Sequence, residues 1–121
     1  MANVVLEKSL DFAVRCVRFY TYLKEEKHEY VLSKQVLRCG TSIGANISEG
    51  QGAQSTPDFI AKLHIALKEA RETAYWLLVL YRSDIMTEDE YVSMNDDLDE
   101  LISLLTSILK STKTNAEILN S

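Results

Sequence analysis

Apolar residues recur at alternating spacings of three and four along most of this chain, and this period restricts the fold more than any other feature. The clearest run comprises Tyr91, Met94, Leu98, Leu101, Leu105 and Ile108. Such spacing places every member on one face of an α-helix, whereas a half-buried strand requires alternation with a period of two. Other long segments show the same period, so the sequence predicts an all-α fold.

Cap residues and turn residues divide this pattern into four segments. The predicted helices lie at about 3–26, 33–49, 57–83 and 88–110. Ser33 is the expected N-cap of the second helix, Ser55 precedes proline at the start of the third, and Thr87 begins a capping box before the fourth. We expect a frayed tail at 112–121. Short connections favour one domain over 1–121, folded as an antiparallel, up-down-up-down four-helix bundle.

The composition suits long helices with few turns. Apolar residues make up 46% of the 121 positions, and the chain has only 4 glycines and 1 proline. A chain of this length can bury a sizeable core without metals or disulfides. Cys16 and Cys39 lie inside the helical patterns without metal-like spacing, so we expect reduced thiols. With no signal peptide and no apolar run of about 20 residues, we expect a cytoplasmic protein without a membrane partner.

Acidic residues are concentrated at the C-terminal end. The net charge of the chain is −5, but residues 87–121 carry eight acids against Lys110 and Lys113, a balance of −6. The remainder of the chain is therefore close to neutral, at +1. A surface that binds phosphate polymers requires clustered positive charge. The charge distribution argues against general binding of nucleic acid.

Two segments carry unusually wide apolar surfaces. In the first helix, one stripe is Leu6, Leu10, Ala13, Val17 and Tyr20, and its neighbour is Val5, Phe12, Cys16, Phe19 and Leu23. In the third helix, residues 75–81 are apolar on every side, and a helix of that kind should be buried on every side. A single bundle leaves part of this segment exposed. We therefore expect another protein surface to bury it, most simply that of a second copy of the chain.

Polar side chains form a further pattern, opposite the apolar stripes of the second and third helices. The second helix contributes Arg38, Ser42, Asn46 and Glu49, beside Gln35, and the third contributes Lys62, Glu69, Glu72 and Trp76, beside Asp58, Ile65 and Leu80. A solvated face is the plain interpretation. However, Ser and Asn are poor helix formers for such a face, and glycines 40 and 44 cost stability unless another backbone approaches closely.

These observations predict a structural or interface motif made of Arg38, Ser42, Asn46, Glu49, Lys62, Glu69, Glu72 and Trp76. Arg38 should pair with Glu69 or Glu72, within the chain or between copies, because charges in an interface must be paired once water leaves. Ser42 and Asn46 should satisfy the remaining polar groups.

Residues that could support catalysis are few. His28 and His64 are the only histidines, and nucleophilic catalysis needs a base beside an activated Ser or Cys. A di-iron bundle needs Glu-x-x-His on two helices, whereas Glu69 and Glu72 form a pair without histidine. The sequence has no glycine-rich phosphate loop and no zinc-ligand spacing. It therefore predicts no catalytic residue, no metal and no cofactor.

Three segments carry a resemblance to a known family. They are RCGTSIGANISEG at 38–50, DFIAKL at 58–63 and IALKEARETAYWL at 65–77. They closely resemble the four helix bundle protein family, also called the S23 or 23S rRNA intervening-sequence protein family, over roughly residues 8–110. The resemblance implies a four-helix fold and a ring-like homopentamer. It also implies kinship with the accessory variability determinant of diversity-generating retroelements, a basic pentamer that binds nucleic acid and a reverse transcriptase.

Two functions follow from these observations. The first is a non-catalytic, homo-oligomeric scaffold or adaptor, with other copies of the chain as partners, five in all by resemblance. The alternative is an accessory protein that binds nucleic acid, with RNA or a reverse transcriptase as partner. Basic residues that could form patches after assembly are Arg15, Arg18, Lys34, Arg38, Lys62, Lys68, Arg71 and Arg82. Acidic residues interleave with them, so we favour the scaffold.

Overall fold

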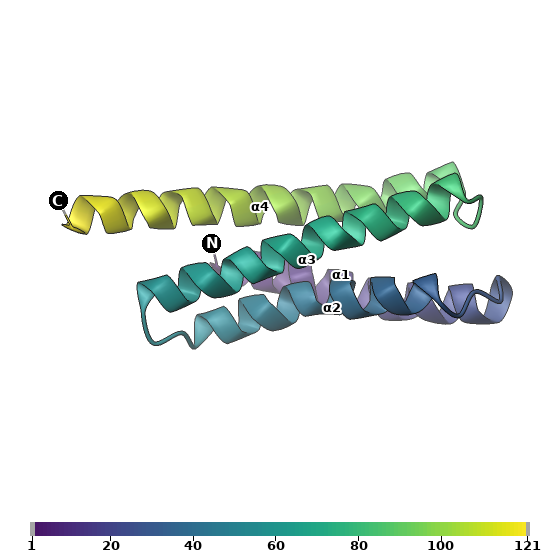
Figure 1. Ribbon diagram of the computed structural model, residues 1–121, viewed down its shortest axis with the longest axis horizontal. Helices are drawn as coiled ribbons and strands as arrows, with labels where there is room; N and C mark the ends of the chain where they lie inside the picture. The colour runs from purple at the N-terminus through teal and green to yellow at the C-terminus, as the bar shows by residue number, and fades with distance from the viewer. Residues whose placement is uncertain (1, 121) are drawn as a thin grey trace.

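The computed structural model describes residues 2–120 and contains four α-helices joined by short loops. They are α1 (Ala2–Glu26), α2 (Leu32–Gln51), α3 (Thr56–Arg82) and α4 (Glu88–Asn120). Successive helices run in opposite directions and lie side by side (Figure 1). No strand occurs within this range. The predicted all-α four-helix bundle is confirmed.

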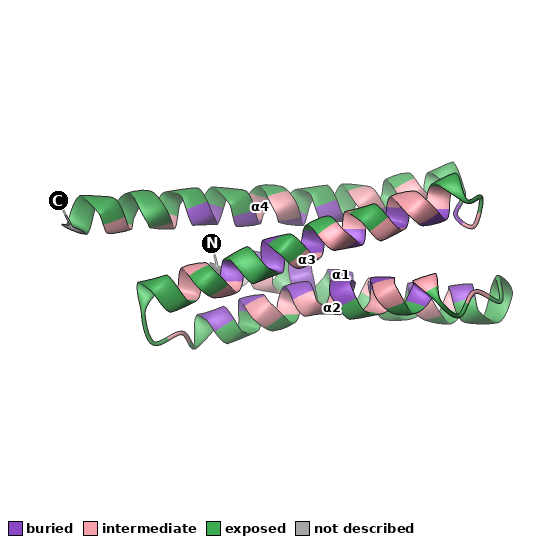
Figure 2. Cartoon of the chain, viewed as in Figure 1, coloured by how far each residue is buried: buried purple, intermediate pink, exposed green. Residues whose placement is uncertain are grey.

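The core lies between the four helices and is continuous along the bundle. Figure 2 shows buried residues at intervals along α4, on the side that faces α3. The largest completely buried side chains include Phe12, Leu23, Ile43, Ile47, Leu63, Leu77, Leu98 and Leu105. α2 packs extensively against both α1 and α3, whereas α4 packs against α3 more extensively than against α1. The bundle is therefore least tightly closed between its first and last helices.

Only one of the two apolar stripes of α1 faces the core. The stripe that includes Phe12 and Cys16 is buried. In the neighbouring stripe, Leu10 is 60% exposed and Val17 is 49% exposed. A bundle core accepts roughly one stripe from each helix, because the rest of the helix circumference faces the neighbouring helices or the solvent. Hence α1 leaves large apolar side chains uncovered.

Glycines in α2 allow α1 to approach closely. A Cβ atom added at Gly40 would lie 2.4 Å from the Cys16 Sγ atom, and one added at Gly44 would lie 3.1 Å from the Ser9 Oγ atom. The first separation is below any normal contact, and the second is tighter than most. At Gly44 the predicted close backbone approach is present, with the Ser9 carbonyl oxygen 3.4 Å from the added Cβ, whereas at Gly40 the close neighbours are the side chains of Cys16 and Phe12. These contacts explain why glycine is used in a helix interior despite its cost of about 1 kcal/mol.

The caps predicted for α3 and α4 are present. The Ser55 hydroxyl accepts a hydrogen bond from the Asp58 backbone N–H at 3.2 Å. The Thr87 hydroxyl accepts from the Glu90 N–H at 3.2 Å, and the Glu90 carboxylate accepts from the Thr87 N–H at 2.8 Å. Reciprocal bonds of this kind satisfy two backbone donors that the helix leaves free.

The start of α2 is capped differently from the prediction. The helix begins at Leu32, and Ser33 lies within it, so Ser33 is not the N-cap. Instead, the Glu29 carboxylate accepts hydrogen bonds from the backbone N–H groups of Val31, Leu32 and Ser33 at 3.1, 2.8 and 2.7 Å. A glutamate side chain just before the helix is long enough to reach several of its free N–H groups, which shorter cap residues cannot do.

Glu29→Gln should therefore destabilise the fold in a pH-dependent way. Partial burial acts to raise the pKa of Glu29, but the backbone N–H bonds outweigh it and hold the pKa below its ordinary value of 4.5. A carboxyl group of this kind stabilises the folded state above the ordinary pKa, and the contribution disappears as pH falls through the lowered pKa. We expect Glu29→Gln to lower the free energy of unfolding by about 1 kcal/mol at pH 7.

Urea denaturation at pH 7 and at pH 3 tests this expectation. The difference between the wild type and Glu29→Gln should shrink at pH 3, because the wild-type carboxyl is then becoming protonated. Glu25→Gln, at an exposed position on α1, is the control and should change little at either pH. Equal stability of Glu29→Gln and wild type at pH 7 would contradict the assigned cap.

The helix α4 extends further than the sequence analysis placed it. It runs to Asn120 instead of ending near 110, so the expected boundary and most of the expected tail at 112–121 are corrected, while residue 121 lies outside the described residues. No glycine or proline follows Pro57 in the sequence, so no residue there stops the helix. In Figure 1 this last part of α4 projects past the other helices.

Candidate functional site: a polar seam between α2 and α3

The eight polar-motif residues lie along the line where α2 and α3 meet, which we call the α2–α3 seam. Arg38, Ser42, Asn46 and Glu49 come from α2, and Lys62, Glu69, Glu72 and Trp76 come from α3. The two helices are antiparallel neighbours, so the start of one faces the end of the other. This arrangement divides the seam into a cluster around Arg38 at one end and an ion pair at the other.

Arg38 joins both predicted carboxylates within a single chain. Its Nη1 atom lies 3.5 Å from the Glu69 Oε2 atom, and its Nη2 atom donates to the Glu72 Oε2 atom. The indole N–H of Trp76 donates to the same Glu72 oxygen at 3.1 Å. A planar guanidinium group with several donors suits such a bridge better than a lysine would. The pairing expected from the sequence thus forms within the chain.

The contacts of Glu72 keep its carboxylate ionised. The Trp76 N–H bond is the largest influence, partial burial opposes it, and the Arg38 guanidinium reinforces it. Together they hold the pKa of Glu72 below its ordinary value. Glu69 is more buried, with a side chain 17% exposed, and its Oε2 atom accepts no hydrogen bond from the described residues. Arg38 is therefore the counter-charge on which Glu69 depends.

The other half of the seam differs from the expected arrangement. Lys62 and Glu49 form an ion pair across it at 3.4 Å. Asn46 instead donates to the backbone carbonyl of Ser42 in its own helix, at 2.8 Å. Neither Ser42 nor Asn46 joins the Arg38 cluster. For the Asn46 amide, the Ser42 carbonyl one turn earlier in α2 is a nearer acceptor than any group of the cluster.

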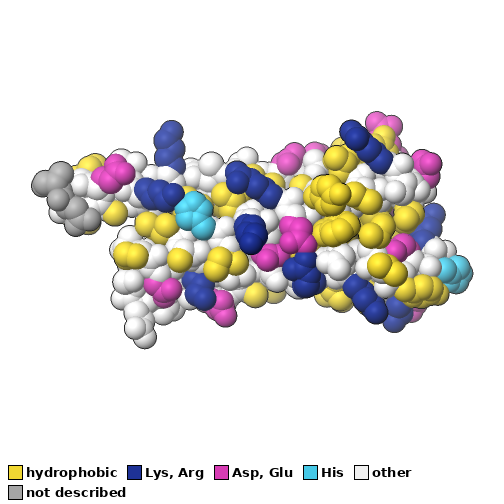
Figure 3. Space-filling model, viewed as in Figure 1, with side chains coloured by type: hydrophobic (Ala, Val, Ile, Leu, Met, Phe, Trp, Pro, Cys, Tyr) yellow, Lys and Arg dark blue, Asp and Glu magenta, His cyan; other side chains and the backbone are white. Residues whose placement is uncertain are grey.

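An exposed apolar patch adjoins the Arg38 end of the seam. Tyr75 is 60% exposed and packs edge to face on Trp76, with ring centroids 5.2 Å apart. A shallow hollow of about 310 Å³ beside it is lined by Tyr75, Leu78, Val79, Arg82 and Ser83. Figure 3 shows hydrophobic side chains gathered toward this end of the molecule. Leu80, which we expected on the outward face, is completely buried in the core.

Sequence reasoning missed Tyr75 as the exposed member of this patch. Tyr75 lies one helical turn from Arg71 and from Val79, so these three residues share a face of α3. That face is rotated about the helix axis, by about one residue position, from the predicted outward face that carries Trp76. The run at 75–81 did signal excess apolar surface. The rotation of α3 about its axis then decides which of those side chains is left outside.

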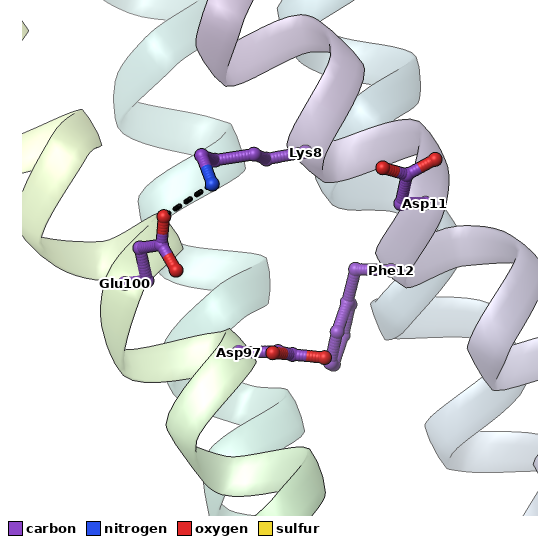
Figure 4. Close-up of a pocket in the computed structure, with 5 residues that line it drawn as sticks. All are labelled: Lys8, Asp11, Phe12, Asp97 and Glu100. Atoms are coloured by element: carbon purple, nitrogen blue, oxygen red, sulfur yellow. Dashed lines mark ion pairs between the residues drawn. The ribbon is translucent and has the colours of Figure 1, made fainter.

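Figure 4 shows a different hollow, between α1 and α4, which is lined by Lys8, Asp11, Phe12, Asp97 and Glu100 and encloses about 150 Å³. Lys8 pairs with Glu100 at 2.5 Å. Two turns further along α1, Arg15 pairs with Asp97 at 2.6 Å. These bonds hold α1 against α4. Among the described residues, no three His, Cys, Asp or Glu side chains are grouped as metal ligands would be.

The side chains considered for catalysis are not arranged for it. Both histidines are exposed, with His28 in the loop before α2 and His64 on α3. Cys16 and Cys39 are buried free thiols. Burial raises the pKa of Cys16 to about 12, so this thiol is not a nucleophile at neutral pH. Within residues 2–120, none of the four helices has the length and hydropathy needed to cross a membrane.

A model of the family described as 23S rRNA-intervening sequence protein matches residues 1–107. The chain belongs to this family. The α2–α3 seam lies within the matched region, whereas the last part of α4, from residue 108 to 120, lies beyond it. The resemblance read from 38–50, 58–63 and 65–77 is confirmed.

A solved structure supports the same assignment. A crystal structure from Bacteroides thetaiotaomicron, described as a protein with unknown function from the S23 ribosomal protein family, is 57% identical to this chain and superposes with a TM-score of 0.89. The match covers 90% of this chain and 97% of the other. No curated protein matches this chain. The family and the fold are thus shown. Because the relative is described as having unknown function, the function of this chain must be inferred from its own surface.

Proposed function

We propose that this chain is a non-catalytic, homo-oligomeric scaffold or adaptor. The observation that carries the proposal is that a chain with a complete core leaves large apolar side chains exposed on two separate faces. Tyr75 and Ile65 are exposed on α3, and Leu10, Val14 and Val17 are exposed on α1. Exposed apolar patches of this kind, bordered by polar residues, are typical of surfaces that bind protein.

The face on α1 is part of a groove that suits close contact. The groove has a volume of about 360 Å³, and Leu6, Ser9, Leu10, Ala13, Thr41, Gly44, Ala45 and Ser48 line it. None of these residues is charged. Two different apolar faces on one chain favour a head-to-tail contact between copies. Such contacts close into a ring when the rotation from each copy to the next adds up to a full circle. The five copies implied by the family resemblance would form in this way.

The α2–α3 seam would have a supporting role in such an assembly. Arg38, Glu69 and Glu72 fix α2 against α3 and hold Trp76 in place under Tyr75. The interface patch is therefore presented by a rigid support, which lowers the entropic cost of association. The buried thiols Cys16 and Cys39 suit a reducing compartment, and we place the assembly in the cytoplasm.

A native mass spectrum of the wild-type chain, supported by light scattering at about 50 μM, tests the proposal. We expect a single oligomeric species, with five copies as the resemblance implies, because aromatic and aliphatic patches associate strongly when they are this exposed. A monomer under both conditions would refute the scaffold proposal.

Binding of nucleic acid is the second candidate, and α4 argues against it. Six of its exposed acids lie between Glu88 and Glu100, and only Asp97 and Glu100 are paired with α1. The unpaired acids would repel phosphate wherever α4 is exposed. The observation in its favour is a row of exposed bases on the outer face of α3, namely Lys68, Arg71 and Arg82.

A further inference from the structure

We propose that a second hollow between α1 and α4, which we call the Arg18 hollow, binds a small aromatic carboxylate. It encloses about 260 Å³ and is lined by Arg15, Arg18, Phe19, Tyr22, Glu90 and Met94. It lies where the bundle is least tightly closed, between its first and last helices. The proposal is carried by an apolar floor beside an arginine that has no partner in the chain.

The floor of the Arg18 hollow is formed by core side chains. Phe19 and Met94 are only 9% and 3% exposed, yet both line the hollow. Tyr22 is half-buried, and its ring is stacked on that of Phe19, with centroids 6.5 Å apart and 27° between the planes. An aromatic ring bound here would contact two rings and a thioether, which are favourable neighbours for it. The hollow therefore suits the apolar part of an aromatic ligand.

The lining also contains one guanidinium group that is available to a ligand. Arg15 is already bound to the Asp97 carboxylate at 2.6 Å and to the Ser93 backbone carbonyl at 3.1 Å. Arg18 is exposed and forms no ion pair or hydrogen bond with another residue in the range 2–120. A guanidinium group can donate two parallel hydrogen bonds to a planar carboxylate. Arg18 would therefore hold the anionic end of the ligand at the edge of the apolar floor.

Glu90 is the acidic member of the lining, and its charge is already engaged. Its carboxylate accepts a hydrogen bond from the Thr87 backbone N–H at 2.8 Å. This bond, opposed by partial burial and reinforced by the Tyr22 hydroxyl, holds the pKa of Glu90 below its ordinary value, and the charge of Lys27 acts in the same direction. The charged groups at the hollow are thus Arg15, Arg18 and Lys27 against Glu90 and Asp97. An excess of one positive charge suits a carboxylate better than a phosphate dianion, which the two acids would repel more strongly.

The neighbouring hollow in Figure 4 has the opposite character. Its charged lining residues are Lys8, Asp11, Asp97 and Glu100. Lys8 is paired with Glu100 at 2.5 Å, so an anion there would meet acids and no available base. Asp97 belongs to that hollow and Arg15 to the other, so their ion pair separates the two. Of these two hollows, only the one at Arg18 is suited to an anion.

The volume and position of the Arg18 hollow define the ligand further. A volume of about 260 Å³ lies just below the range of about 300–1,000 Å³ for sites that enclose drug-sized ligands, so one or two fused rings fit better than a nucleotide. Arg18 and Tyr22 lie about 120° around α1 from the exposed Leu10 and Val17, at 100° per residue. The site is therefore separate from the α1 groove proposed for association, and the two proposals can fail independently.

Equilibrium dialysis with 2-naphthoate tests the site, and 2-naphthamide is the matched neutral compound. We expect wild type to bind 2-naphthoate with a Kd below about 1 mM in 50 mM NaCl. It should bind 2-naphthamide about fivefold more weakly, because the amide keeps the rings but has no charge for Arg18. Arg18→Gln should weaken binding of 2-naphthoate about fivefold, as expected for an exposed charge pair, and leave 2-naphthamide unchanged. Lys34→Gln, at an exposed position on α2, is the control and should bind both compounds as wild type does.

Several results would overturn the proposal. One is the absence of saturable binding of 2-naphthoate up to 5 mM, and another is equal affinity of wild type for the two compounds. If Arg18→Gln weakens both compounds equally, Arg18 only shapes the hollow and does not recognise the carboxylate. If Arg82→Gln weakens binding instead, the compound lies in the hollow beside Tyr75. Binding that meets the expectations supports the site whether the wild type is a monomer or an oligomer, so failure of the scaffold proposal does not decide this one.

Discussion

Gly40→Ala is expected to destabilise the protein by about 2 kcal/mol, although alanine is the better helix former. The added Cβ atom would lie 2.4 Å from the Sγ atom of Cys16, a completely buried side chain. Overpacking of a filled core costs about 1–3 kcal/mol, and the gain in helix propensity of about 1 kcal/mol offsets only part of a clash this severe. Urea denaturation followed by circular dichroism measures the loss.

A second substitution identifies the cause. In a Cys16→Ala background the sulfur atom is absent, and the next nearest atoms to the added Cβ are at 3.4 and 3.7 Å, which is ordinary contact. There, Gly40→Ala should cost little or stabilise, so the two substitutions should be strongly coupled. Gly52→Ala is the matched control, because its nearest neighbour would be 3.8 Å away and its φ of −97° suits any residue. Loss of stability by the same amount in both backgrounds would show that the contact with Cys16 is not the cause.

Tyr75→Glu should reduce the assembly to monomers while leaving the helices intact. The side chain is 60% exposed in the single chain, so the substitution disturbs little of the core. In the assembly the same position would be covered, and burial of an unpaired carboxylate is costly. Sedimentation velocity should show the loss of the large species. The circular dichroism spectrum should keep its helical form, and stability of the monomer should change by no more than about 0.5 kcal/mol.

Trp76→Phe is the informative companion to Tyr75→Glu. It keeps an aromatic ring at the same position but removes the N–H group that donates to Glu72. We expect it to remain assembled and to lose about 1 kcal/mol of stability, as for a single hydrogen bond. If Tyr75→Glu stays fully assembled, the apolar patch on α3 is not the interface. If Trp76→Phe disperses the assembly, the seam contributes more directly than a supporting role allows.

The sequence predicted the seam well where helix periodicity alone decides the geometry. Positions 38, 69, 72 and 76 occupy known faces of two helices joined by a short loop, so their meeting follows from the antiparallel packing of neighbours. Arg38 accordingly reaches both Glu69 and Glu72. The sequence could not assign Asn46, because its amide chooses between a partner across the seam and the carbonyl of Ser42, and small differences in distance decide that choice.

What the sequence determined by itself is the number of helices, the caps of α3 and α4, and the excess of apolar surface. These depend on period, on cap chemistry and on composition, which are local properties. The tertiary structure alone decided which of two adjacent stripes on α1 is buried and whether Leu80 or Tyr75 faces outward. The rotation of each helix about its axis depends on the volumes that it meets on its neighbours. Gly40 leaves room for Cys16, and that fit turns Leu10 and Val17 to the outside.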